Sequence, residues 1–242
     1  TILLLVLALS LNGFGQVIKD SIFSNRLDKY RYLSISLPPS YGKDAKRAYP
    51  LLLALDGDYL FDPIQGTLKY AYYWDDLPEV ILVGLNHTTD TERDEECKVD
   101  ETTGLPEGIG ESFFEFIGGE LLPYLQKNLR IAPFKIVAGH DVTAGFMNFY
   151  LYKDNPVFNA YISLSPVMPL DMETRIPERM ATFQTNMFYY VASADGDIKS
   201  IKDKVVALDT QMKAANLAKV NYRYDEFKGC SHYSLVPFAI PS

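Results

Sequence analysis

The chain has 242 residues, of which 48% are hydrophobic and 22% are charged, so it can bury the core of one large globular domain. Its formal net charge is −8 and no block of lysine or arginine stands out, which argues against nucleic acid or an anionic membrane as a partner. No histidines and cysteines are clustered at metal-ligand spacing, so we expect neither a metal nor another cofactor.

The first residues predict export. An uncharged apolar run from Ile2 to Leu11 is followed by Gly13 and Gly15, at the spacing that signal peptidase recognises, and the run is too short to span a bilayer. The initiator methionine and a basic leader are missing, so we expect that the sequence starts inside the gene product. We therefore expect residues 1–16 to be a signal peptide that is removed, and the mature chain to be periplasmic or secreted, without a transmembrane span.

The rest of the chain alternates between strand-like and helix-like patterns. Strand-like runs cover Val17–Phe23, Tyr30–Leu37, Leu51–Leu55, Val80–Leu85, Phe134–Ala138, Ala160–Leu164, Met187–Ala192 and Val220–Phe227. Helical patterns cover Phe61–Trp74, Ser112–Leu129, Thr143–Lys153 and Ile198–Asn216. The runs Leu51–Leu55 and Val80–Leu85 are typical of strands that are buried on both faces of a parallel sheet.

We therefore predict a single α/β domain over residues 17–242. Its central sheet is mostly parallel and has helices on both faces, and antiparallel strands lie at the N-terminal edge. The sequence stops at Ser242, just where a final helix would pack, so we expect that the native C-terminus is missing. No feature of the sequence specifies an oligomeric state.

Polar loops follow the core strands. In an open parallel sheet, ligands bind beyond the carboxyl ends of the strands. The loops after Leu55, Leu85, Ala138, Ala194 and Phe227 should therefore open on one edge. Together these loops offer the following ionisable side chains: Asp56, Asp58, His87, Asp141, Asp195, Asp197 and His232.

The stretch "IVAGHDVTAG" has the pattern of a nucleophile elbow, G-x-S-x-G, in which the nucleophile sits on a strained turn between a strand and a helix. Gly139 keeps the first glycine, Asp141 takes the central position, and Thr143 replaces the second glycine. Aspartate is one of the few residues that tolerate a positive φ. We therefore predict that Asp141 occupies the turn with φ above zero.

The order of the ionisable residues supports this interpretation. Asp141, then Asp195 or Asp197, then His232 follow the order nucleophile, acid, histidine, and each comes just after a predicted strand. We expect these side chains to converge at the carboxyl edge of the sheet.

Backbone donors for an oxyanion are expected from two loops. One is the N–H group of Val142, and the other comes from the loop after Leu55, near Asp58 or Tyr59. His87 is a further candidate to line the cleft, although a lone loop histidine is more often a solvated surface group.

Taken as a whole, the sequence resembles the exported α/β-hydrolase esterases of the enterochelin esterase and esterase D-like group. The resemblance covers nearly the whole mature chain, and these stretches carry it: "YPLLLALDGDYLF", "VILVGLNHTTDTERD", "SFFEFIGGELLPYLQKNLR", "FKIVAGHDVTAG", "FNAYISLSPVM" and "GCSHYSLVP". Members of the group normally have Gly-His-Ser-x-Gly-Gly at the elbow. The resemblance therefore implies an α/β-hydrolase fold, with Asp141 in place of the serine, His232 as the histidine and Asp195 as the acid.

The aspartate leaves three functions open. The first is a carboxylic-ester hydrolase in which Asp141 supports catalysis or His232 activates water as a general base. The second is a catalytically inactive protein on the same scaffold that binds either a ligand, such as a small-molecule ester or a related molecule, or a partner. The third is a hydrolase that attacks alkyl carbons through Asp141, but such enzymes usually carry tryptophan directly after the aspartate, whereas this chain has Val142 there and its only tryptophan is Trp74.

The two cysteines are a candidate disulfide, and the alternative is two unpaired thiols. Cys97 and Cys230 lie in loops that should project from the same edge of the sheet, and export would make a bridge possible. Such a bridge would tie the loop after Val80–Leu85 across the site.

Overall fold

The computed structural model describes residues 17–242 with the exception of residue 216. The predicted signal peptide and the last residue of the helix predicted over Ile198–Asn216 lie outside the described residues. Within the described part, none of the helices combines the length and the apolar character that a membrane span requires.

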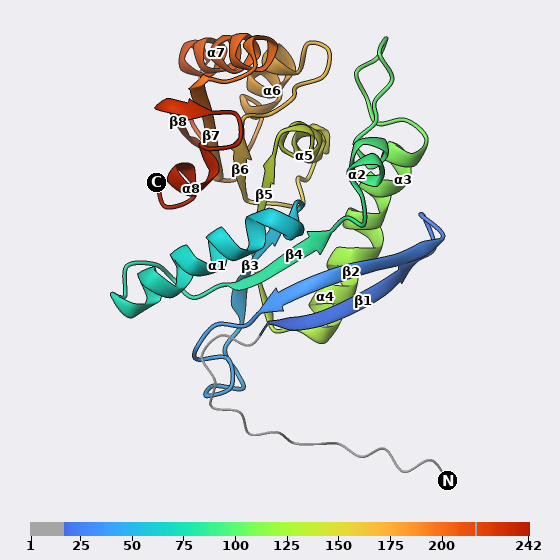
Figure 1. Cartoon of the computed structure of the whole chain (residues 1–242), viewed down its shortest axis with the longest axis vertical. Helices are drawn as coiled ribbons and strands as arrows, with labels where there is room; N and C mark the ends of the chain where they lie inside the picture. The colour runs from blue at the N-terminus through green and yellow to red at the C-terminus, as the bar shows by residue number, and fades with distance from the viewer. Residues whose placement is uncertain (1–16, 216) are drawn as a thin grey trace.

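The strands form one 8-stranded sheet in the order β1-β2-β4-β3-β5-β6-β7-β8. The strands are β1 (Ile18–Ser24), β2 (Lys29–Ser36), β3 (Tyr49–Ala54), β4 (Ile81–Asn86), β5 (Ile131–His140), β6 (Ala160–Leu164), β7 (Met187–Gly196) and β8 (Val220–Ser231). The pairs β1–β2 and β2–β4 are antiparallel, and all the others are parallel. The predicted sheet with an antiparallel N-terminal edge is therefore confirmed, and β1 and β8 lie at its two ends (Figure 1).

Helices cover both faces of this sheet. They are α1 (Gly57–Tyr73), α2 (Asp90–Glu96), α3 (Ile109–Phe116), the π-helical turn η1 (Ile117–Leu121), α4 (Leu122–Asn128), α5 (Val142–Phe146), the 3₁₀ segment η2 (Met147–Tyr152), α6 (Met172–Met180), α7 (Lys199–Ala214) and α8 (Val236–Ala239). The four helical patterns in the sequence correspond to α1, to α3 through α4, to α5 with η2, and to α7. The sequence did not predict α2 or α6.

The two faces of the sheet have separate apolar layers. Alternate residues of a strand point to opposite faces. Accordingly, Leu53 packs in a layer with side chains from α3 to α7, whereas Leu52 packs in a smaller layer with α1 and α8. This explains why the core strands are apolar throughout.

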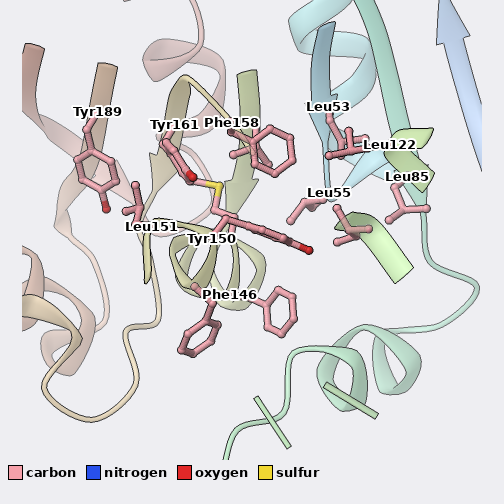
Figure 2. Packing of buried hydrophobic residues seen from close by; sticks show 14 of the residues in the cluster. Leu53, Leu55, Leu85, Leu122, Phe146, Tyr150, Leu151, Phe158, Tyr161 and Tyr189 are labelled. Carbon is pink, nitrogen blue, oxygen red and sulfur yellow. The ribbon is translucent and has the colours of Figure 1, made fainter. Parts of the chain in front are cut away.

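The larger layer is rich in aromatic side chains. Tyr150 is fully buried there, near Phe158 and Tyr161, and its hydroxyl group donates to the backbone oxygen of Phe114. Figure 2 shows these rings together with leucines from the sheet and from α4. The hydrogen bond meets the need of the buried hydroxyl for a partner. This layer supports α5, the helix that begins at the elbow.

Candidate active site

The elbow joins β5 to α5. Asp141 has φ 61° and ψ −123°, so the predicted positive φ is confirmed. This ψ lies outside the left-handed helical region, which is where aspartate is tolerated best. Tertiary contacts hold the strained backbone instead. The N–H group of Asp141 donates to the backbone oxygen of Leu164 at 3.0 Å, and its carbonyl oxygen accepts from the N–H group of Val167 at 3.0 Å.

Two glycines allow the close packing that the elbow requires. A Cβ atom at Gly139 would lie 2.8 Å from the backbone nitrogen of Ala144. A Cβ atom at Gly145 would lie 1.7 Å from the carbonyl oxygen of Val167. Gly145 therefore permits a close approach on the helix side even though Thr143 replaces the second glycine of the motif.

His232 lies between two carboxylates. Its Nε2 atom is 3.4 Å from Oδ1 of Asp141, and its Nδ1 atom is 2.7 Å from Oδ1 of Asp197. The side chain of His232 is only 5% exposed. The hydroxyl group of Ser165 donates to the other oxygen of Asp197 and so helps to orient that carboxylate. The structure thus brings one residue from each of three loops together at the carboxyl edge of the sheet.

The acid beside His232 is Asp197 and not Asp195. Strand β7 continues to Gly196, so Asp195 is still part of the strand. The Asp195 carboxylate accepts a hydrogen bond from the N–H group of Gly229 at 2.8 Å and does not reach the histidine. Sequence order alone left both aspartates open, and the family pattern favoured Asp195; the position at which the strand ends selects Asp197.

Arg93 is a site residue that the sequence analysis missed. It lies on α2, and its Nη1 atom is 3.1 Å from Oδ2 of Asp141. Its Nε atom donates to Oδ1 of Asp56 at 2.6 Å, and its Nη2 atom donates to the backbone oxygen of His140 at 2.8 Å. One guanidinium group therefore joins the loop after β3 to the elbow.

A local signal for α2 was present in the sequence. The order Thr89-x-x-Glu92 is a capping box, and the hydroxyl oxygen of Thr89 indeed accepts from the N–H group of Glu92. The segment has no apolar periodicity, so its sequence pattern favours a polar loop. A short helix held by ion pairs carries no such periodicity.

Asp56 connects Asp141 and Thr143, the two residues that differ from the usual elbow motif. Its carboxylate is fully buried and accepts from Arg93, from the N–H group of His140 and from the hydroxyl group of Thr143. A continuous chain of polar contacts therefore runs from Thr143 through Asp56 and Arg93 to Asp141. The threonine and the aspartate belong to one network.

Burial and neighbouring charges shift the pKa values of the ionisable side chains in the site. Burial alone would lower the pKa of His232, but its contacts with Asp141 and Asp197 outweigh burial and raise the pKa to about 9. Burial alone would raise the pKa of Asp141, but His232 and Arg93 lower it to about 2. Burial and the neighbouring His232 lower the pKa of His140. At neutral pH the site therefore holds an imidazolium between two carboxylates.

This arrangement predicts a pH-dependent stability. The pKa of His232 is raised on folding from 6.5 to about 9, so its contribution is fully present below about pH 6.5 and is lost as the pH rises towards 9. We expect a loss of about 2 kcal/mol over that range, measured as the free energy of unfolding in urea. An NMR titration of the His232 ring should show the raised pKa directly, and Asp141→Asn should lower it. A ring that titrates near 6.5 would contradict the ion-pair geometry.

The predicted oxyanion donors are only partly available. Val142 and Asp58 lie in the first turns of α5 and α1, where N–H groups have no partner within the helix. The N–H group of Tyr59, in contrast, donates to the backbone oxygen of Asp56 at 3.2 Å. The side chain of His87, predicted to line the cleft, is only 4% exposed and points into the protein.

The predicted disulfide is wrong. Cys97 and Cys230 are both free. Cys97 follows α2 and packs against the larger apolar layer, whereas Cys230 lies in β8 and packs against the smaller one. The sheet separates the two thiols, so their loops do not project side by side. Among the described residues, no three histidine, cysteine, aspartate or glutamate side chains are grouped so that they could hold a metal ion.

The sheet order and the strained elbow define an α/β-hydrolase fold. The family model described as "Putative esterase" matches residues 24–234. The chain therefore belongs to this esterase family, and the resemblance to an esterase group stated from the sequence is confirmed.

Solved structures show the same fold. An uncharacterised protein from Capnocytophaga ochracea is 29% identical and superposes with a TM-score of 0.84 over 93% of this chain, which spans only 62% of that protein. An IroE-like serine hydrolase from Shewanella oneidensis is 21% identical, with a TM-score of 0.78 over 93% of this chain and 78% of its own. The enterobactin esterase FES from Shigella flexneri is 16% identical, with a TM-score of 0.71 over 93% and 57% of the two chains. No curated protein matches the chain.

Proposed function

We propose that the protein binds a small carboxylic ester, or a molecule of similar shape, without cleaving it at neutral pH. The observation that carries the proposal is the pairing of Asp141. Its Oδ1 atom lies 3.4 Å from Nε2 of His232, and its Oδ2 atom lies 3.1 Å from Nη1 of Arg93. A carboxylate in two ion pairs must lose them before it can attack a carbon atom. Its pKa of about 2 also makes it a weak nucleophile.

The charge of His232 argues against base catalysis as well. A general base must be unprotonated to accept a proton from water. With a pKa of about 9, only about 1% of the rings are neutral at pH 7. His232 therefore serves to balance the charge of Asp141 and Asp197.

Exposed apolar side chains around the site support ligand binding. Tyr233 is 76% exposed and its ring centroid lies 4.9 Å from that of His232. Tyr59 is exposed beside His140, and Ile198 is exposed directly after Asp197. Such side chains can cover the apolar part of an ester.

The charge balance favours a neutral ligand. The site has the carboxylates of Asp56, Asp141 and Asp197 against the cations of Arg93 and His232, so one negative charge is left over. An anionic ligand would be repelled, whereas an ester carries no charge and can use the free N–H donors at the helix starts.

The test compares the wild type with Asp141→Ala on p-nitrophenyl acetate at pH 7. We expect the two proteins to show the same background rate. Calorimetry with ethyl cinnamate should detect binding to the wild type, and Tyr233→Ala should weaken it several-fold. Tyr73→Ala, which changes an exposed ring on α1 away from the elbow, is the matched control. Wild-type hydrolysis that Asp141→Ala abolishes would replace our proposal by an aspartate-dependent esterase.

One observation favours a second candidate at alkaline pH. Asp197 orients His232 in the manner of a catalytic acid, at 2.7 Å. Once deprotonated, His232 could activate water for slow hydrolysis. The rate would then increase as the pH rises through 9 and disappear in His232→Ala. A rate that follows background hydrolysis at all pH values would rule this candidate out.

A further inference from the structure

His87 is the one histidine of the chain that the proposed site does not use. It follows β4, at the point where β3 and β4 stop pairing. Its side chain is nearly completely buried although it comes from a loop. Burial of a polar ring requires hydrogen-bond partners, and these partners show what the ring does.

The ring joins the loop after β3 to a buried ion pair. Its Nε2 atom lies 2.9 Å from the backbone oxygen of Leu55. Because a carbonyl oxygen can only accept, this nitrogen must carry the hydrogen. The Nδ1 atom lies 3.1 Å from Oε2 of Glu96, whose other oxygen pairs with the guanidinium group of Arg31. Both Glu96 and Arg31 are buried, so the His87 ring lies against a buried ion pair.

The backbone of His87 makes a second contact with the same loop. Its N–H group donates to Oδ2 of Asp58 at 2.8 Å. Between these two contacts lies Gly57, where a Cβ atom would be 2.7 Å from the carbonyl carbon of Gly84 in β4. The segment from Leu55 to Asp58, which includes the first two residues of α1, therefore packs closely against β4 and is held by a hydrogen bond at each end.

We infer that His87 is a positioning residue that holds the Leu55–Asp58 loop, and with it the free N–H group of Asp58, in place for the carbonyl oxygen of a bound ester. This inference rests on the proposed function, since it assigns a role to the same site. It goes further in naming a buried residue, outside the cleft, that sets the position of one oxyanion donor. The pairing of β3 with β4 ends at Ala54 and Gly84. Beyond that point, the His87 ring supplies the hydrogen bond to the backbone oxygen of Leu55 that a neighbouring strand would otherwise make.

Two variants separate the loop contact from general stability. In His87→Gln, the side-chain amide can still reach the backbone oxygen of Leu55. In His87→Asn, the shorter amide can reach only Glu96. Lys29→Met is the matched control, because Lys29 pairs with Glu92 and Glu96 at 2.6 Å and 2.8 Å but does not touch the loop.

Hydrogen exchange in the otherwise wild-type protein gives the first readout. We expect peptides that cover residues 55–60 to exchange about tenfold faster in His87→Asn, and to stay close to wild type in His87→Gln and Lys29→Met. This measurement needs no catalysis. Unchanged exchange in His87→Asn, or the same increase in Lys29→Met, would overturn the inference.

Kinetics in the Asp141→Ser background give the second readout. Loss of one oxyanion donor costs about 10²–10³-fold in kcat in serine hydrolases. A displaced donor should cost less, so we expect kcat for p-nitrophenyl acetate to fall about 10- to 100-fold in His87→Asn, with little change in KM and with partial rescue in His87→Gln. Equal losses in the Gln and Asn variants would overturn the inference. If Asp141→Ser itself is inactive, the exchange result alone decides the role of His87. Failure of the wild type to bind ethyl cinnamate would contradict the proposed function and leave the exchange result unaffected.

Discussion

Asp141→Ser is expected to hydrolyse p-nitrophenyl acetate on the order of 10²–10³-fold faster than the wild type at pH 8. The substitution places a hydroxyl group on the strained turn, which tertiary hydrogen bonds already hold at φ 61°. It also removes one of the two carboxylates beside His232, so the pKa of the ring should fall towards neutrality and allow it to act as a base. Asp197 would remain as the orienting acid.

Asp141→Asn is the matched control for this gain. It relieves His232 of the same negative charge and keeps the shape of the side chain, but it supplies no nucleophile. We expect it to stay at the background rate of the wild type. A serine variant that is folded but no faster than the asparagine variant would show that more than the nucleophile has been lost. The threonine at position 143 would then be the next residue to change to glycine.

Arg93→Met should destabilise the protein by about 3 kcal/mol. The guanidinium group is the only cation that contacts the fully buried carboxylate of Asp56 among the described ion pairs, at 2.6 Å. Removing one partner of a buried ion pair leaves an uncompensated charge, which typically costs 3–5 kcal/mol. Hydrogen bonds from His140 and Thr143 remain, so the lower part of that range is expected.

Urea unfolding provides the measurement, with Lys199→Met as the control. Lys199 pairs with Asp203 on the exposed face of α7, and exposed pairs contribute less than about 1 kcal/mol. Adding Asp56→Asn to Arg93→Met should recover part of the loss, because the buried charge then disappears together with its partner. If Arg93→Met lowers the free energy of unfolding by less than about 1 kcal/mol, the ion pair with Asp56 contributes little to stability.

Much of the fold follows from the sequence. All eight predicted strands are present in the sheet, because a short apolar run bounded by polar residues is a local property of the chain. The elbow at Gly139 to Asp141 and the position of His232 after the last strand are also readable from the sequence. These features depend on residues that are neighbours along the chain.

The tertiary structure alone decided the partners of these residues. Arg93 reaches Asp141 from 48 residues away through a short helix that has no apolar periodicity. The end of β7 selects Asp197 over Asp195, and the sheet separates Cys97 from Cys230. An ion pair requires a separation of a few ångströms between segments that are distant in sequence. Such distances arise from the packing of whole elements. The order of residues along the chain therefore indicates the candidate site, whereas the fold determines which charged groups contact one another there.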